Sequence, residues 1–327
     1  MDNLLDIRNL AVEFSTDRGL VRAVDSVNLT LDAGETLAIV GESGSGKSVT
    51  ALSILGLLGD AGRMASGSIH FDGTDLAAMS AQNLRQVRGN RIAMIFQEPM
   101  SSLNPSLTIG KQVAEPIWLH RSVPWAEAYA EAAELLAQVA IPDAASRLDD
   151  YPHQFSGGMR QRVMIAMALA CQPDLIIADE PTTALDVTVQ AQILALLKEL
   201  TRKSNAALIL ITHDLGVVAR YADRVAVMYA GRIVETADAR SLYARPQHPY
   251  TRGLLASIPS LDGQAGTRLA TIDGQPPDLA NLPAGCAFAS RCPLARDHCH
   301  SDQPALEPIS SGRVSSTRHL KACFVDG

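Results

Sequence analysis

Short apolar runs alternate along much of the chain with longer stretches of helical periodicity. Four runs rich in Ile, Val and Leu are typical of buried parallel strands and lie at residues 36–40, 91–96, 175–178 and 207–211. Each leads into a polar or glycine-containing corner and then, directly or after an insertion, into a helical pattern, as at residues 48–58 and 187–203. This order predicts an open α/β sheet that binds ligands at the carboxyl ends of its strands.

The pattern changes in two other places. Residues 224–229 and 232–235 flank Ala230-Gly231, a two-residue hairpin signal, so we expect the sheet to close with an antiparallel element. Residues from about 98 to 170 are rich in alanine and helical in pattern, as at 125–139. They predict a helical insertion into the sheet domain.

Proline content marks a change near residue 235. Nine of the 17 prolines lie in the last 91 residues, from Ala237 onward. We therefore expect a core domain over residues 1–235 and a loop-rich C-terminal extension over residues 236–327.

Composition and charge exclude several classes of protein. Hydrophobic residues make up 47% of the chain and charged residues 19%, which supports a sizeable core and excludes wholesale disorder. A net charge of -7 argues against nucleic acid as a partner. No apolar run approaches the roughly 20 residues of a membrane span, and the N-terminus does not read as a secretory signal. We expect a cytoplasmic protein that reaches a membrane only through a partner.

A glycine-rich loop follows the first strong strand and opens a helix. Its sequence is Gly41-Glu-Ser-Gly-Ser-Gly-Lys-Ser48, hereafter the phosphate loop. Glycines allow backbone N–H groups to turn inward around phosphate oxygens, and the helix N-terminus adds positive partial charge. Lys47 can reach β- and γ-phosphates, while the Ser48 hydroxyl can bind Mg²⁺. The residues that we expect to contact nucleotide here are Gly41, Ser43, Gly44, Ser45, Gly46, Lys47, Ser48 and Val49.

Polar residues end the other predicted strands. Asp179 can hold Mg²⁺ beside the phosphate loop, and Glu180 can accept a proton from an attacking water. Taken alone, this Asp-Glu pair is more often a structural helix-capping signal, and a lone histidine is usually structural. With the phosphate loop present, we expect His213 to contact the γ-phosphate and Gln97 to contact the metal or the attacking water.

A second anion-directed helix start lies at Ser156-Gly157-Gly158. One chain thus carries two helix starts suited to phosphate but only one lysine-bearing loop. The sequence therefore predicts that Ser156, Gly157 and Gly158 serve a nucleotide bound by another subunit, with ATP at the interface of a dimer.

Together these residues resemble the nucleotide-binding subunit of an ABC transporter. The resemblance spans residues 5–235 and is carried, in order, by the phosphate loop, Gln97, Phe155-Ser-Gly-Gly-Met159, residues 175–180, Ala184-Leu185-Asp186 and His213. It implies a P-loop NTPase fold of the ABC type with ATP and Mg²⁺ between two head-to-tail subunits. Met159 and Phe155 stand where the family usually has Gln and Leu, and neither alters the Ser-Gly-Gly core.

The C-terminal extension resembles the tail of dipeptide and oligopeptide importer ATPases, which nickel importers share in large part. The resemblance rests on residues 246–259 and 285–293. It implies a homologous second ATPase subunit, two membrane permease subunits and a solute-binding protein, with this chain peripheral on the cytoplasmic face of the inner membrane. A nickel or other small-solute importer and a soluble non-transport ABC ATPase are the alternatives.

Four of the five cysteines lie in the extension: Cys286, Cys292, Cys299 and Cys323. Such a cluster in a cytosolic protein more often binds a metal than forms disulfides, but this spacing identifies no particular metal. The importer resemblance implies a [4Fe-4S] cluster, which Cys₄ ligation suits. Zinc, helped by the nearby His298, His300 and His319, and free thiols are the alternatives.

Overall fold

The computed structural model describes residues 3–17, 19–98, 102–183, 185–258, 271–309 and 319–325. The chain forms two compact units. The first comprises Met1–Leu31, Leu37–Ala77 and Thr212–Gly327, and the second comprises Asp32–Thr36 and Ala78–Ile211.

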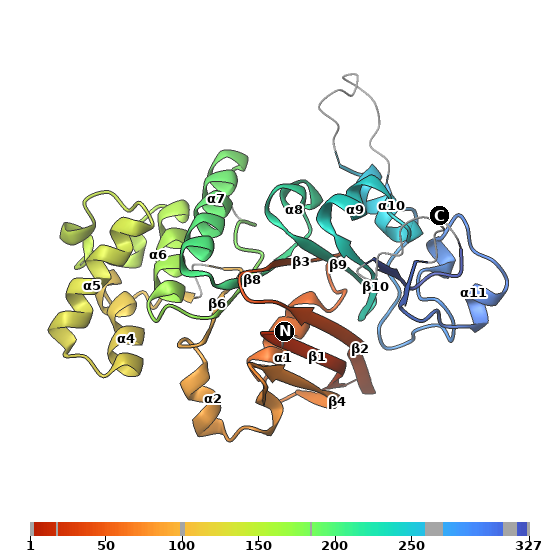
Figure 1. Cartoon of the computed structure of the whole chain (residues 1–327), viewed down its shortest axis with the longest axis horizontal. Coiled ribbons are helices and arrows are strands. Elements are labelled where there is room, and N and C mark those ends of the chain that lie inside the picture. Colours follow the sequence, from red (N-terminus) through yellow and green to blue (C-terminus); the bar gives the residue numbers. More distant parts are fainter. Residues whose placement is uncertain are drawn as a thin grey trace. The chain divides into compact units, whose positions relative to one another are not determined.

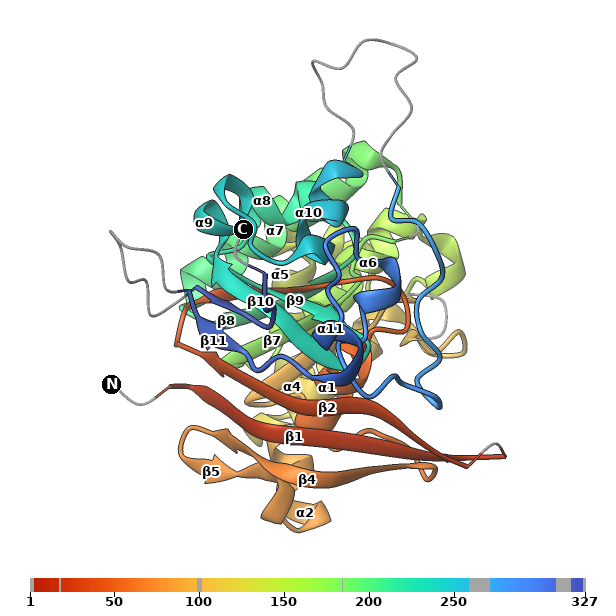
Figure 2. The ribbon, with the colours of Figure 1, turned by 90° about the vertical axis from the view of Figure 1, so that its right-hand side faces the viewer.

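An antiparallel sheet forms one part of the first unit. Its strand order is β2-β1-β4-β5, and Figure 2 shows the long strands β1, β2 and β4. The strands are β1 (Leu5–Thr16), β2 (Gly19–Leu31), β4 (Gly62–Phe71) and β5 (Thr74–Asp75). The sequence analysis missed this sheet, because β1 and β4 mix apolar with polar and charged residues where continuous apolar runs were sought.

The second sheet of this unit carries the strand before the phosphate loop. β3 (Thr36–Val40) pairs in parallel with β9 (Arg224–Tyr229), which pairs in antiparallel fashion with β10 (Arg232–Asp238). Ala230 and Gly231 adopt positive φ angles of 47° and 82° between them, which confirms the predicted hairpin. Two short strands of the extension continue this edge: β12 (Leu320–Lys321) and β11 (Glu307–Pro308).

Helices of the first unit follow strands or lie in the extension. They are α1 (Lys47–Ile54), α8 (Leu215–Tyr221), α9 (Ala239–Ala244), α10 (Pro249–Ala256), α11 (His298–Ser301) and the 3-10 turns η1 (Leu76–Ala78) and η4 (Ala289–Arg291). The helix expected over residues 48–58 is shorter than predicted, since it ends at Ile54 and Gly56 turns to a φ of 61°.

Parallel strands and long helices make up the second unit. β7 (Leu175–Asp179) lies between β6 (Ile92–Ile95) and β8 (Ala207–Thr212), and all three are parallel. Figure 1 shows α4, α5 and α6 as neighbouring helices, which agrees with the expected helical segment. The helices are α2 (Ala81–Val87), α4 (Ile109–Arg121), α5 (Trp125–Gln138), α6 (Gly157–Leu169), α7 (Val187–Ser204) and the 3-10 turns η2 (Ala144–Arg147) and η3 (Pro152–Gln154).

An apolar cluster joins the extension to the strands of the first unit. Tyr250 and Phe288, both of the extension, pack with Val227 and Tyr229 of β9 in this cluster. The predicted boundary between residues 235 and 236 remains a prediction. In the described ranges, none of the helices combines the length and the apolar character that a membrane crossing needs.

Candidate functional site

The phosphate loop links β3 to α1, and close backbone approaches require two of its three glycines, Gly41 and Gly46. A Cβ atom on Gly41 would lie 2.1 Å from the carbonyl oxygen of Met228, and one on Gly46 would lie 2.6 Å from that of Ala23. Gly46 is also the N-cap of α1, with a φ of 102°. An L side chain would therefore distort the loop at both positions.

Lys47 lies within the phosphate loop. Its side chain is buried, and Nζ donates hydrogen bonds to the carbonyl oxygens of Gly41 (2.8 Å) and Glu42 (2.9 Å). No side chain caps the N-terminus of α1, and the buried Ser45 Oγ has no hydrogen-bond partner among the described residues. A cation, a helix N-terminus and an unsatisfied hydroxyl in one short loop are suited to an anion.

The first unit also contains His213. It follows β8 at an exposed corner and precedes α8, as the sequence predicted. Asp214, the next residue, caps α8 by accepting hydrogen bonds from the N–H groups of Gly216 and Val217. The contact of His213 with a γ-phosphate stays a prediction.

The second unit brings Gln97 and Glu180 together. These residues follow the parallel neighbours β6 and β7, and Gln97 Nε2 donates to Glu180 Oε2 at 3.1 Å. Thr183 Oγ1 donates to the same oxygen at 2.8 Å. Sequence analysis missed Thr183, although a hydroxyl three residues after a candidate base is a signal that could have identified it.

Glu180 also has an unusual backbone. Its φ is 45°, in the left-handed region, and its N–H donates to the carbonyl oxygen of Ile211 at 3.0 Å. A non-glycine residue held there costs about 1–3 kcal/mol and is often found at functional sites. Asp179, immediately before it, is the buried last residue of β7.

Ser156 is the N-cap of α6 and accepts a hydrogen bond from the N–H of Met159 at 3.3 Å. A Cβ atom on Gly158 would lie 2.9 Å from Val189 Cγ1 of α7, so this glycine allows the two helices to approach. The predicted helix start is thus formed. That a second subunit uses this helix start stays a prediction. Asp186 is the N-cap of α7 and accepts hydrogen bonds from the N–H groups of Thr188 and Val189, and Ala184 of the same motif lies outside the described residues.

The other three cysteines of the extension act on the pKa of Cys286. Burial, with a smaller contribution from Cys323, Cys299 and Cys292, raises the pKa of Cys286. Each sulfur accepts a backbone hydrogen bond, from residue 288, 294, 296 or 325. Among the described residues, however, no group of three or more His, Cys, Asp or Glu side chains is placed so that it could hold a metal ion. Four thiols are donors that suit a thiolate-bound metal, but the expected metal site is not formed among the described residues.

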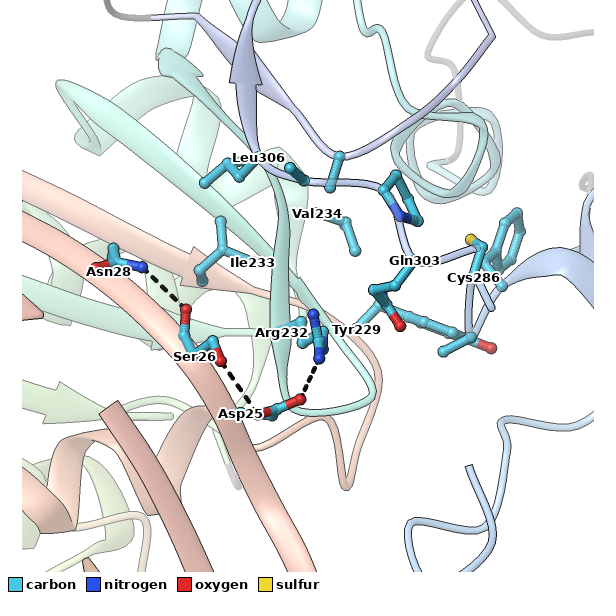
Figure 3. Close-up of a pocket in the computed structure, with 15 residues that line it drawn as sticks. Asp25, Ser26, Asn28, Tyr229, Arg232, Ile233, Val234, Cys286, Gln303 and Leu306 are labelled. Carbon is cyan, nitrogen blue, oxygen red and sulfur yellow. Dashed lines mark hydrogen bonds and ion pairs between the residues drawn. The ribbon is translucent and has the colours of Figure 1, made fainter. Parts of the chain in front are cut away.

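A cavity of about 240 Å³ lies beside Cys286 (Figure 3). β2, the β9–β10 hairpin and the extension supply its walls. The two charged residues in its lining, Arg232 and Asp25, form an ion pair with each other. Asp25 also accepts a hydrogen bond from Ser26 at 3.2 Å. The cavity lies outside the predicted nucleotide-binding residues.

Two family descriptions match the chain: "ABC transporter" over residues 24–183 and "Oligopeptide/dipeptide transporter, C-terminal region" over residues 234–299. The oligopeptide transport ATP-binding protein OppD of Salmonella typhimurium is 53% identical over 98% of this chain and 93% of its own. The chain belongs to the ABC transporter ATP-binding proteins of the oligopeptide and dipeptide group. The dipeptide transport ATP-binding protein DppD of Bacillus subtilis is 55% identical over 99% of this chain and 95% of its own.

A solved structure agrees with this assignment. The ATP-binding cassette MJ0796, dimeric, in a post-hydrolysis state and bound to ADP and Pi, superposes with a TM-score of 0.65 at 30% identity. The match covers 72% of this chain and 99% of that one. The predicted family and the α/β ABC-type fold are therefore confirmed, and ATP hydrolysis is the activity of this family. The C-terminal match over residues 234–299 includes both segments of the predicted tail, residues 246–259 and 285–293. Pro259 lies outside the described residues of the structure.

Proposed function

We propose that this chain is the ATP-hydrolysing subunit of a di- and oligopeptide importer. The observation that carries the proposal is the phosphate loop, in which Lys47 and an uncapped helix start enclose a site suited to an anion. The relatives named above are oligopeptide and dipeptide transport ATP-binding proteins. Nickel import and a soluble non-transport role are not favoured by these names.

The chemistry is attack of water on the γ-phosphate. Glu180, oriented by Gln97 and Thr183, accepts the proton of the attacking water. Lys47 binds the β- and γ-phosphates, and His213 contacts the γ-phosphate. Ser48, Gln97 and Asp179 would hold Mg²⁺, which spreads the charge of the phosphates.

Assembly completes the site. Ser156, Gly157 and Gly158 would face the phosphate loop of a homologous second ATPase, and the dimeric MJ0796 cassette supports such a pairing. Two permease subunits and a solute-binding protein would complete the importer, with this chain peripheral on the cytoplasmic face of the inner membrane.

We propose that Cys286, Cys292, Cys299 and Cys323 bind a [4Fe-4S] cluster that staples the loop-rich extension. What supports this is the backbone hydrogen bond to each sulfur, because such bonds stabilise thiolate ligands. Zinc is the alternative metal, and iron and zinc analysis of anaerobically purified protein distinguishes the two.

The experiment that tests the main function is a titration of the full chain with a fluorescent ATP analogue. Lys47→Ala should weaken binding strongly, because it removes a charge-assisted contact to phosphate. An affinity equal to that of the unmodified protein would remove Lys47 and its loop from the nucleotide site. Uptake of labelled peptide by vesicles holding the assembled permease then tests the transported solute.

A further inference from the structure

Glu42 is the second residue of the phosphate loop, and its N–H, its carbonyl oxygen and its carboxylate all make hydrogen bonds. Its N–H donates to Tyr250 Oη at 2.8 Å, and its carbonyl oxygen accepts from Lys47 Nζ at 2.9 Å. Its carboxylate accepts two hydrogen bonds from Arg291, with Nη1–Oε2 at 2.7 Å and Nη2–Oε1 at 3.0 Å. Two of these three attachments come from the C-terminal extension, which is more than 200 residues away in sequence.

The side chain of Arg291 is also held in place by contacts other than the one with Glu42. Its side chain is only 3% exposed, and it donates from Nε to the carbonyl oxygen of Asp273 at 3.1 Å and from Nη1 to Tyr229 Oη at 3.2 Å. Its guanidinium also lies 5.9 Å from the centre of the Phe288 ring. A buried cation that is bound on several sides presents a rigid fork to a carboxylate. The hydrogen bonds with Glu42 raise the pKa of Arg291 above its usual value, so the guanidinium stays charged.

Tyr250 is equally constrained. It is fully buried, and its ring packs against Tyr229 at 4.6 Å and Phe288 at 5.4 Å between centres. Its oxygen therefore reaches the Glu42 N–H from a fixed direction. A buried aromatic cluster of the extension and β9 thus determines where the first peptide of the phosphate loop lies.

We propose that Arg291 and Tyr250 are positioning residues for ATP binding, which act on the phosphate loop through Glu42. The inference rests on the proposed nucleotide site at Lys47. The physical reason is that hydrogen bonds connect both positioning residues to Lys47 through Glu42. Lys47 Nζ donates to the carbonyl oxygens of both Gly41 and Glu42, so displacement of Glu42 also displaces the ammonium group of Lys47. Correct geometry of a preformed anion site lowers the entropy lost on binding. The C-terminal extension therefore contributes to ATP affinity without contacting the nucleotide.

The test is a double-mutant cycle on the full chain, read by titration with a fluorescent ATP analogue. Arg291→Ala and Glu42→Ala should each weaken affinity about tenfold, within the range of ordinary coupling between sites. The double variant should bind no more weakly than either single variant, because both changes break the same link. Arg296→Ala is the matched control, since this exposed arginine lies in the same segment, and it should bind ATP normally.

A kinetic measurement separates positioning from general loss of structure. In the assembled transporter, Arg291→Ala should raise KM for ATP in proportion to the loss of affinity, while kcat stays within about twofold. Arg291→Lys keeps the charge but not the two-pronged contact and should recover only part of the affinity. Normal ATP affinity in a folded Arg291→Ala protein, or a double variant whose losses multiply, would overturn the inference.

Removal of Arg291 can also prevent folding, so a milder variant is needed. Tyr250→Phe keeps the buried ring and removes only the oxygen that accepts from Glu42, and it should weaken ATP binding about threefold. Wild-type affinity in folded Tyr250→Phe protein would refute the role of Tyr250. Lys47→Ala serves as the reference. Normal ATP affinity in Lys47→Ala would refute the proposed nucleotide site. Weakened affinity in Lys47→Ala together with normal affinity in Arg291→Ala would refute only the positioning role of Arg291.

Discussion

Gln97 and Glu180 are joined by a hydrogen bond of 3.1 Å, although 83 residues separate them in sequence. The bond follows from the register of the parallel strands β6 and β7, in which Ile95 is paired with Ala178. Each side chain lies two residues beyond its strand's paired position, so the two meet at the carboxyl edge of the sheet. The carboxylate of Glu180 is thereby oriented by its own unit before any nucleotide is bound.

Glu180→Gln should keep ATP affinity and lower turnover by roughly 10²–10⁴-fold, because an amide cannot accept the proton of the attacking water. Steady-state hydrolysis by the assembled transporter measures the loss, and analogue titration measures the affinity. Hydrolysis at the wild-type rate would remove Glu180 from the role of base.

Thr183→Ala tests the second donor to Glu180. Loss of its 2.8 Å hydrogen bond should lower kcat about fivefold, since one exposed bond contributes about 1 kcal/mol, and should leave ATP affinity unchanged. Thr183→Ser is the control, because it keeps the hydroxyl and should restore most of the rate. Equal rates for the alanine variant and the unmodified protein would show that Thr183 does not orient the base.

Sequence patterns predicted the parallel strands, the hairpin at Ala230-Gly231 and the helix starts at Lys47 and Ser156, because local signals determine each of them. They missed the antiparallel sheet of β1, β2 and β4. They also missed the ion pair between Arg291 and Glu42, which joins two segments 249 residues apart in sequence. A buried arginine between Phe288 and Cys292 needs an anionic partner, but its sequence neighbourhood does not say which carboxylate that is.

Acid should loosen the extension through His248. This residue is 1% exposed, and its Nδ1 accepts from the Tyr250 N–H at the start of α10, so the structure holds it neutral. Burial lowers its pKa to about 4. Because an unfolded histidine titrates near 6.5, the unfolded chain binds more protons between these values. Stability is therefore full above about pH 6.5 and falls toward pH 4, by at most about 3 kcal/mol.

Glu235 contributes to the acid sensitivity with the same sign. Burial acts to raise the pKa of Glu235. Hydrogen bonds to its carboxylate outweigh burial and lower this pKa; they come from His319 and from the N–H groups of Gln247 and His248, among others. The contribution of Glu235 is lost only as the pH falls below about 4.5, its ordinary pKa, so thermal unfolding at pH 7.5, 5 and 4 separates the earlier loss due to His248 from the later loss due to Glu235. His248→Asn removes one titration and keeps a capping side chain, so it should lose stability less steeply as the pH falls. An identical slope in this variant would contradict the role of His248.

The isolated chain should hydrolyse ATP slowly, because a complete site needs Ser156, Gly157 and Gly158 from a second subunit. Addition of the homologous ATPase and the permease should raise the rate. Ser156→Ala should lower the rate of the assembled complex about tenfold, the effect of one lost phosphate contact, without changing ATP affinity of the isolated chain. Ser156→Thr keeps the hydroxyl that caps α6 and serves as the control. Full activity from a demonstrably monomeric protein would contradict the shared site.

The cysteines of the extension allow a direct measurement of metal. If all four ligate a [4Fe-4S] cluster, protein purified without oxygen should be brown and contain about four irons per chain. Cys292→Ser should remove the iron and loosen the extension, because the loops there have little apolar core of their own. ATP binding at Lys47 should persist but weaken, since Arg291 precedes Cys292 and holds Glu42. Cys171→Ser, outside the extension, is the matched control and should keep all the iron. Colourless protein with one zinc would favour the alternative metal, and colourless protein with four titratable thiols would refute both.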